Sequence, residues 1–262
     1  MKFDISSLQN PQVKHIVRLR DDKRQRRRDH LMLVEGLAEI NLAVASGYRP
    51  QAILAAPELA SQQPENVPVK ITTVSRVVFE KISSRENPDG WLAIFPTPSP
   101  SLAELRSSDP PLFIVPESIE KPGNLGAILR TADAAGVDAV LVCDPLVDLY
   151  NPNVVRASRG ALFTVPCLEV SNQSALDFLR SHGIKIVAAT PQAEAEYTRQ
   201  DLGGPLAIAV GTEDQGLTDF WLRHADRKVK IPMKGRVNSL NVSIATALMV
   251  YEALRQRSQG KG

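Results

Sequence analysis

Three loops in the second half of the sequence hold residues whose types and spacing could do chemistry. The first loop, PGNLGAILRTADAAG at 122–136, follows the apolar run Leu112–Val115, so a strand, a glycine-bearing turn and a helix come in succession. Gly123 and Gly126 allow the backbone to approach a ligand closely, and Asn124 is expected to cap the helix. This arrangement predicts a phosphate-like or cofactor-like ligand at the turn.

One charged residue, Arg130, lies within the same helix. Its neighbours there are mostly small and apolar. A charged side chain in such surroundings is costly to bury unless it points into a polar site. We therefore expect Arg130 to look into a binding site.

The first loop also has a second interpretation. Asp144 ends the next strand, 18 residues after Gly126. This spacing is similar to that of a dinucleotide-binding fingerprint, in which an acidic side chain binds the ribose. The full G-x-G-x-x-G pattern is absent and only G-x-x-G is present. A dinucleotide-dependent enzyme remains an alternative at this point.

The second loop, VGTEDQGL at 210–217, follows an apolar strand and includes Glu213 and Asp214. Ligands bind at the carboxyl edge of open α/β sheets, which is where this loop is expected to lie. A carboxylate that only stabilises a turn or a helix end is the alternative interpretation of Glu213.

The third loop opens the segment IPMKGRVNSLNVSIATAL at 231–248. Ser239 is placed to cap the last helix, and Asn241 is an unexpectedly polar residue in its first turn. The backbone N–H groups of Ser239 and Leu240 could hold the polar head of a ligand. Simple helix capping by Ser239 is the alternative.

A dense basic cluster lies near the N-terminus, although the net charge of the chain is only +2. Its eight cationic side chains are accompanied by only two acidic ones, Asp21 and Asp22. The cationic residues are Lys14, Arg18, Arg20, Lys23, Arg24, Arg26, Arg27 and Arg28. Such a density is typical of a surface that binds a polyanion, with a solvated helix face as the alternative.

The rest of the composition narrows the class of protein. Cys143 and Cys167 lie in strand-like apolar runs, which favours reduced core thiols in a cytoplasmic protein over a disulfide framework. No apolar stretch reaches the ~18 residues of a membrane span, and the N-terminus lacks the apolar region of a secretory signal. The histidines and cysteines lack the spacing of metal ligands, so we expect no metal.

Two regions are expected to position these residues. Residues 1–96 alternate a basic helix at 10–29 with short strands and helices, and the proline- and serine-rich stretch at 97–111 indicates a linker. Apolar strands then alternate with helices as far as a final helix at 240–257. Because both faces of these strands are apolar, we predict an α/β fold with a mostly parallel sheet for residues 112–262.

Taken together, the three loops resemble the three motifs of the SpoU (TrmH-like) family, the ribose 2′-O-methyltransferases of the SPOUT superfamily. PGNLGAILRTADAAG is similar to motif one, VGTEDQGL to motif two and IPMKGRVNSLNVSIATAL to motif three, in that order along the chain. In the N-terminal part, NPQVKHIVRLRD and LMLVEG resemble the substrate-binding domain that accompanies many members directed to ribosomal RNA.

The resemblance implies a fold and a set of site residues. The family fold is an α/β sheet whose C-terminal segment threads through a loop to form a trefoil knot, here beside a smaller N-terminal α/β RNA-binding domain. The implied cofactor is S-adenosylmethionine, with binding positions that correspond to Gly211, Glu213, Ile231, Met233, Ser239 and Leu240. The implied catalytic positions are Asn124, Arg130, Glu213, Ser239 and Asn241.

The activity implied by the resemblance is methyl transfer to a ribose 2′-hydroxyl group of RNA, with ribosomal RNA favoured over tRNA. Arg130 would bind phosphate oxygens bidentately and orient the ribose, while Glu213 and Asn241 would hold the arginine or polar ligand groups. The resemblance also implies a homodimer, while the cytoplasmic location and the lack of a membrane or metal partner are expected from the composition described above. A non-catalytic RNA-binding protein of the same fold is the rival, and the intact motif residues count against it.

Overall fold

The computed structural model describes residues 2–65, 67, 69–212, 214–237 and 239–259. The chain forms two compact units. The first comprises the residues up to Pro98 together with Asp148–Thr164, and the second comprises Ser99–Val147 together with the residues from Val165 onward. Among the described residues, no helix is long and apolar enough to cross a membrane.

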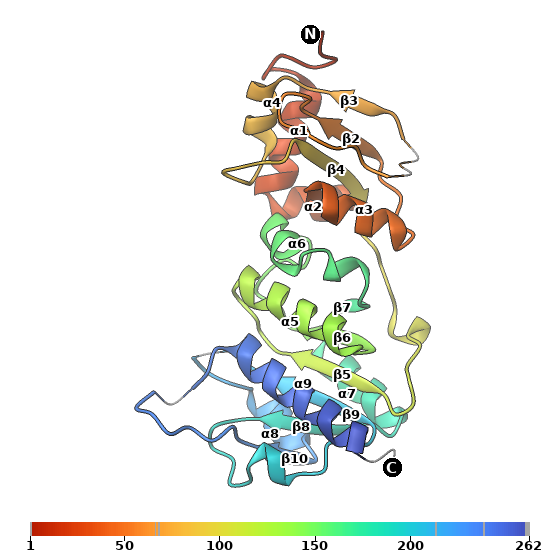
Figure 1. Ribbon diagram of the computed structural model, residues 1–262. Coiled ribbons are helices and arrows are strands. Elements are labelled where there is room, and N and C mark those ends of the chain that lie inside the picture. Colours follow the sequence, from red (N-terminus) through yellow and green to blue (C-terminus); the bar gives the residue numbers. More distant parts are fainter. Residues whose placement is uncertain (1, 66, 68, 213, 238, 260–262) are drawn as a thin grey trace. The chain divides into compact units, whose positions relative to one another are not determined.

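The first unit is built on a four-stranded mixed sheet (Figure 1). Its strands, in spatial order, are β1 (Leu31–Glu35), β4 (Trp91–Pro96), β2 (Ala52–Ala55) and β3 (Ile71–Thr73). β4 runs antiparallel to β1 and β2, whereas β2 and β3 are parallel. The helices are α1 (Pro11–Asp21), α2 (Lys23–Asp29), α3 (Leu37–Ala45), α4 (Arg76–Ile82), α6 (Pro152–Ser158) and the 3₁₀ turn η2 (Ala161–Phe163).

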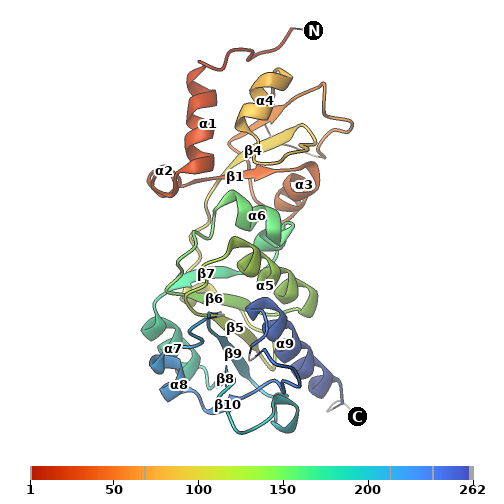
Figure 2. The same ribbon diagram turned by 90° about the vertical axis from the view of Figure 1, so that its left-hand side faces the viewer.

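Both faces of this sheet are covered. Leu31 and Leu33 of β1 belong to one apolar cluster with α1 and α4, while Met32 and Val34 are buried on the opposite face, as the two-residue period of a strand requires. α1 and α4 pack together on the first face, and α3 and α6 lie on the other (Figure 2). Burial on both sides explains why β1 reads as a continuous apolar run.

A segment from the middle of the chain, Asp148–Thr164, completes the first unit, and we name it the returning segment. The ring of its Phe163 packs edge-on against Tyr48 at 5.1 Å between centroids. A buried ion pair joins Asp148 to Arg26, with 2.6 Å between Oδ2 and Nη2. The expected boundaries at 96 and 112 do not include this segment, because its partners lie more than a hundred residues away in the sequence.

The second unit is a six-stranded sheet in which every strand pair is parallel. In spatial order the strands are β10 (Arg227–Val229), β8 (Lys185–Ala189), β9 (Leu206–Val210), β5 (Leu112–Pro116), β6 (Ala139–Cys143) and β7 (Cys167–Val170). The α-helices are α5 (Pro122–Ala135), α7 (Asn172–Ser181), α8 (Asp219–His224) and α9 (Val242–Gln259). Short 3₁₀ turns are η1 (Leu102–Glu104) and η3 (Tyr197–Arg199). The predicted parallel α/β fold is confirmed.

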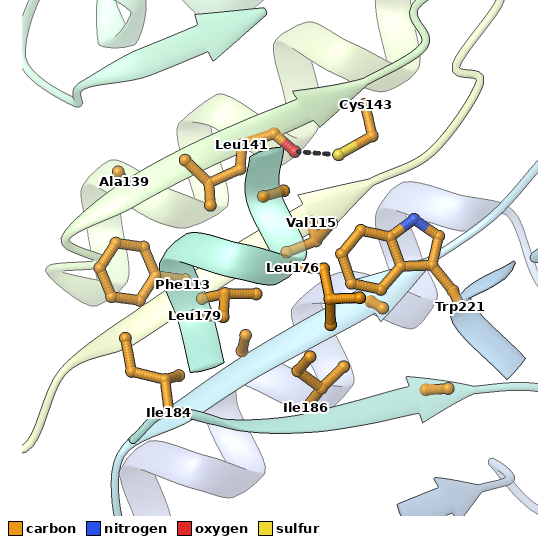
Figure 3. Close-up of a cluster of buried hydrophobic side chains, with 14 of the residues drawn as sticks. Phe113, Val115, Ala139, Leu141, Cys143, Leu176, Leu179, Ile184, Ile186 and Trp221 are labelled. Carbon is orange, nitrogen blue, oxygen red and sulfur yellow. Dashed lines mark hydrogen bonds between the residues drawn. The ribbon is translucent and has the colours of Figure 1, made fainter. Parts of the chain in front are cut away.

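Helices cover the parallel sheet on both sides. α5 and α9 pack together on one face, and α7 and α8 lie on the other (Figures 1 and 2). The core under α7 and α8 includes Phe113, Leu176 and Trp221, all buried (Figure 3). Cys143 lies at the edge of this core, where burial and the nearby carboxylates of Asp144 and Glu117 raise the pKa of its thiol.

Three helix ends differ from the sequence-based predictions. The basic helix expected at 10–29 is broken at Asp22, which adopts an extended backbone and caps α2 by accepting the N–H of Arg24 at 2.8 Å. α5 begins at Pro122 rather than after Asn124, because proline is favoured in the first turn, where no N–H donor is needed. α9 begins at Val242, so the expected cap at Ser239 is wrong.

Candidate functional site

A cavity of about 720 Å³ opens at the carboxyl ends of β8 and β9. Its wall brings together the segments that follow these strands and the segment that precedes α9. The lining includes Gly211, Ile231, Met233, Ser239 and Leu240, which are the described members of the predicted cofactor set. Glu213, predicted for both cofactor binding and catalysis, lies outside the described residues. The size suits a ligand of nucleoside dimensions.

The loop after β9 folds back on itself tightly. Thr212 and Gly216 exchange both backbone hydrogen bonds, at 3.1 and 3.0 Å. Gly211 lies so close to this turn that an added Cβ would come 2.0 Å from the carbonyl carbon of Gly216. Only glycine fits there, so at this point of the cavity wall the turn packs directly against the end of β9.

Two asparagines connect the first and third motif loops. The side-chain Nδ2 of Asn241 donates to Oδ1 of Asn124 at 3.0 Å. Oδ1 of Asn241 accepts the backbone N–H of Ser243 at 3.0 Å and its hydroxyl at 2.6 Å, which fixes the orientation of the amide. Asn241, and not Ser239, therefore caps the start of α9. The structure brings these two predicted catalytic residues together.

A small hollow of about 30 Å³ lies beside the asparagine pair. Lys121, Asn124, Thr212 and Asp214 contribute to its lining. Thr212 and Asp214 also line the large cavity. Through these two shared residues, the hollow beside the asparagine pair adjoins the large cavity.

Arg130 is exposed and lines neither the large cavity nor the small hollow, so its expected place in a binding site stays a prediction. The buried face of α5 is made by Leu125, Ile128, Leu129 and Ala132, at the spacing of one helix stripe. Arg130 lies outside this stripe and so projects from the helix surface. Its guanidinium is available to a ligand that approaches from solvent.

The predicted RNA-binding cluster divides into exposed and structural members. Arg26 is only 3% exposed; it pairs with Asp148 and donates to the carbonyl oxygens of Leu19 and Arg20 at 2.7 and 2.9 Å. Its assignment to RNA binding is therefore wrong, because no large ligand can reach it. Lys14, Arg18, Arg24, Arg27 and Arg28 are exposed.

Arg20 is the second structural member of the basic cluster. Its Nη1 donates to the carbonyl oxygens of Lys81 and Ser83 at 2.7 and 3.0 Å, and its guanidinium pairs with Asp21. These bonds fix the end of α1 against α4. Lys23 is half-buried, so the surface that remains for a polyanion is narrower than the sequence indicated.

The geometry tests the dinucleotide interpretation of the first loop. Asp144 accepts the side-chain Nδ2 of Asn172 at 2.6 Å and does not line the large cavity, so the dinucleotide interpretation has no ribose-binding acid there. Within the described ranges, no three His, Cys, Asp or Glu side chains gather in a way that could hold a metal ion.

Sequence reasoning missed one polar cluster near the cavity, made by buried Glu117, half-buried Asn172 and exposed Thr218. Glu117 follows β5 directly, and its carboxylate is 1% exposed. An acidic residue at the carboxyl end of a buried strand was the signal that could have drawn attention to it.

Comparison with known proteins gives two matches along the chain. Residues 111–251 match the SpoU rRNA methylase family, and residues 10–93 match the MRM3-like substrate-binding domain. Among curated relatives, the 23S rRNA (guanosine-2′-O-)-methyltransferase RlmB of Pseudomonas syringae pv. tomato is 38% identical over 205 residues, which are 72% of this chain and 82% of the relative.

Solved structures resemble nearly the whole chain. A crystal structure of an RNA 2′-O ribose methyltransferase has a TM-score of 0.86 at 42% identity and covers 97% of this chain and 99% of its own. The AdoMet-bound rRNA methyltransferase from Sinorhizobium meliloti has a TM-score of 0.86 at 28% identity, with 96% and 97% covered.

Proposed function

Because the chain belongs to the SpoU rRNA methylase family, we propose that it transfers the methyl group of S-adenosylmethionine to a ribose 2′-hydroxyl group of ribosomal RNA. The observation that carries this proposal is the placement of the Asn124–Asn241 pair beside a cavity of about 720 Å³. Methyl transfer requires the methyl donor and the ribose to be bound side by side. The cavity is large enough for the donor, and the asparagine pair offers polar groups to the ribose next to it.

The cavity residues fit S-adenosylmethionine. Gly211 lets the turn at Gly216 and Leu217 fold tightly at the cavity wall, and Ile231, Met233 and Leu240 add apolar residues to the lining beside the polar Ser239. When bound, the cofactor supplies a methyl group on a positively charged sulfur, which makes it an electrophile. Glu213 remains a predicted contact of the same loop.

The chain's own residues orient the nucleophile. Displacement at a methyl group is in-line, so alignment of the 2′-oxygen contributes much of the rate. Arg130, exposed on α5, presents a planar fork that binds phosphate oxygens bidentately and so holds the ribose beside the asparagines. The planar fork of donors, with no acceptor, suits this orienting role.

The finer features of the family are part of the same proposal. We infer that the segment leading to α9 threads through a loop as a trefoil knot, which is consistent with its contribution to the same cavity wall as the loop after β9. A cytoplasmic location and the absence of a metal requirement stay predictions.

We also infer that the protein acts as a homodimer. α9 exposes an apolar stripe of Ile244, Leu248 and Tyr251, which are 53%, 37% and 51% exposed. They line a shallow hollow of about 390 Å³ together with Tyr197. Clustered exposed apolar side chains on one helix support an interface with a second copy.

The test of the reaction uses radiolabelled S-adenosylmethionine, ribosomal RNA from a strain that lacks the gene, and bulk tRNA as the alternative substrate. We expect label in ribosomal RNA, with a ribose 2′-O-methyl group as the mapped product. A synthetic substrate with a 2′-deoxy nucleotide at the mapped position should accept no methyl group. Label in tRNA alone, or methylation of the deoxy substrate, contradicts the proposal.

A further inference from the structure

Glu117 is a buried carboxylate that the proposed reaction does not use directly. It follows β5, and its backbone N–H donates to the carbonyl oxygen of Val210 at the end of β9, at 2.8 Å. Its side chain is 1% exposed. Burial of a carboxylate lowers stability unless hydrogen bonds satisfy its oxygens. The hydrogen-bond partners of Glu117 therefore indicate its role in the structure.

Both oxygens of Glu117 bind Thr218. Oε2 accepts the backbone N–H of Thr218 at 2.8 Å, and Oε1 accepts its hydroxyl at 2.7 Å. Thr218 occupies the N-cap position of α8, where a threonine ordinarily bonds to its own helix; here it makes no such capping bond. The hydroxyl is directed to Glu117 instead, so this contact takes the place of local helix capping.

Asn172 fixes the carboxylate from the other side. Its Nδ2 donates to Glu117 Oε1 at 3.1 Å, and its Oδ1 accepts the indole N–H of buried Trp221 at 2.7 Å. Since Trp221 belongs to α8, the amide cannot rotate without breaking a bond to the same helix that Thr218 begins. Glu117 is therefore held in one orientation.

The position of Thr218 gives this cluster its significance. Thr218 comes directly after the loop Gly211–Leu217, most of whose described residues line the large cavity. The loop's first residue, Gly211, lies against Gly216 and Leu217 without room for a side chain. Glu117 binds Thr218, the residue that follows the loop, and its own backbone N–H is bonded to Val210 of β9. Both ends of the loop are therefore fixed relative to β9.

We propose that Glu117 is a positioning residue for the cofactor: by binding the N–H and hydroxyl of Thr218, it holds the described residues of the loop after β9, in particular Gly216 and Leu217, in the arrangement that binds S-adenosylmethionine. This inference rests on the proposed function, because the ligand of the cavity is taken from it. Glu117 does not line the cavity and acts only through Thr218.

The first unit offers a matched control. Asp4 accepts both the backbone N–H and the hydroxyl of Thr73, each at 2.8 Å, which is the same pattern of a carboxylate binding one threonine twice. Thr218→Val and Thr73→Val each remove one hydroxyl from such a pair at nearly constant volume. The backbone bond remains in both variants.

The experiment measures the Kd for S-adenosylmethionine by calorimetry, and KM and kcat for methyl transfer, on the full chain. We expect Glu117→Gln and Thr218→Val to raise Kd and KM for S-adenosylmethionine at least ~10-fold, the scale of a lost hydrogen bond to a charged group. kcat at saturating cofactor should stay within about threefold of the parent. Thr218→Ser keeps both donors and should restore parental binding, and Thr73→Val should leave binding unchanged.

The outcomes separate this inference from the proposed function. If the parent protein binds no S-adenosylmethionine, the proposed function fails. If the parent binds and folded Glu117→Gln binds within about twofold of it, Glu117 is not a positioning residue. Should Glu117→Gln not fold, Thr218→Val decides, because the side chain it changes is exposed and leaves no buried cavity. A variant that only melts earlier, with unchanged Kd and KM, also overturns the inference.

Discussion

Arg130 combines a predicted role in the reaction with a position that contributes little to folding. It projects from the surface of α5, so the apolar face of that helix does not depend on it. A structural arginine in a buried ion pair, such as Arg26, is tied to the stability of the protein instead. This contrast at the residue scale allows catalysis and stability to be separated by mutation.

We predict that Arg130→Ala folds and binds S-adenosylmethionine as the parent does, while methyl transfer to RNA falls at least ~100-fold, the scale of losing a positioned catalytic group. Arg130→Lys should recover little, because an ammonium group cannot bind two phosphate oxygens through a planar fork. Single-turnover rates with saturating cofactor and RNA measure the effect. Near-parental turnover of the alanine variant would rule out the orienting role.

At the scale of elements, α2 carries two kinds of arginine only two residues apart. Arg24 is exposed, whereas Arg26 is buried against the returning segment. We predict that Arg24→Ala weakens RNA binding and lowers the slope of log K against log salt by about 0.7–0.9, the contribution of one phosphate contact. Filter binding at several salt concentrations measures both quantities.

Arg26→Ala is the matched comparison within the same helix. It should lower the free energy of unfolding by about 3–5 kcal/mol, because Asp148 is then left buried without its partner. Urea denaturation of both variants checks the distinction. If Arg24→Ala destabilises the protein as much as Arg26→Ala, or leaves the salt dependence unchanged, the division of the basic cluster is wrong.

Elements with a local signal were predicted well from the sequence. The runs Leu112–Val115 and Ala139–Cys143 are apolar on both faces, and they form β5 and β6 of a parallel sheet. The break at Asp22 was missed, since the charged pattern continues through it and a single capping bond to Arg24 decides the boundary. Aspartate is a preferred N-cap residue, but in a continuous charged pattern the sequence does not distinguish a capping aspartate from one that lies exposed within a helix.

Partnerships across long separations could not be predicted from the sequence. Arg26 and Asp148 are 122 residues apart, and Glu117 and Thr218 are 101 residues apart. The sequence therefore did not separate the buried from the exposed members of the basic cluster, and it gave no reason to single out Glu117. The motif resemblance pointed to the loops that line the large cavity and to the asparagine pair, but gave no account of what holds these loops in place.

For the whole molecule, the apolar stripe of α9 leads to a prediction about assembly. Leu248→Glu should convert the proposed dimer to a monomer, because a charge at the centre of a buried apolar contact has no partner. Val77→Glu is the control, since Val77 is also exposed and lies on α4 of the first unit. Sedimentation velocity measures the mass of each. A parent that is monomeric at micromolar concentration contradicts the proposed dimer.

The returning segment also determines when, during synthesis on the ribosome, the first unit can finish folding. A ribosome releases the residues up to Pro98 long before it releases Asp148–Thr164, which finish the same unit. At a synthesis rate of ~5–20 residues per second, the returning segment is synthesised roughly 3–13 s after Pro98. During this interval, the apolar face of β1 against which α6 packs stays uncovered by α6. The N-terminal unit is thus begun first and completed late, and its final folding step takes place while the ribosome is still building the parallel sheet.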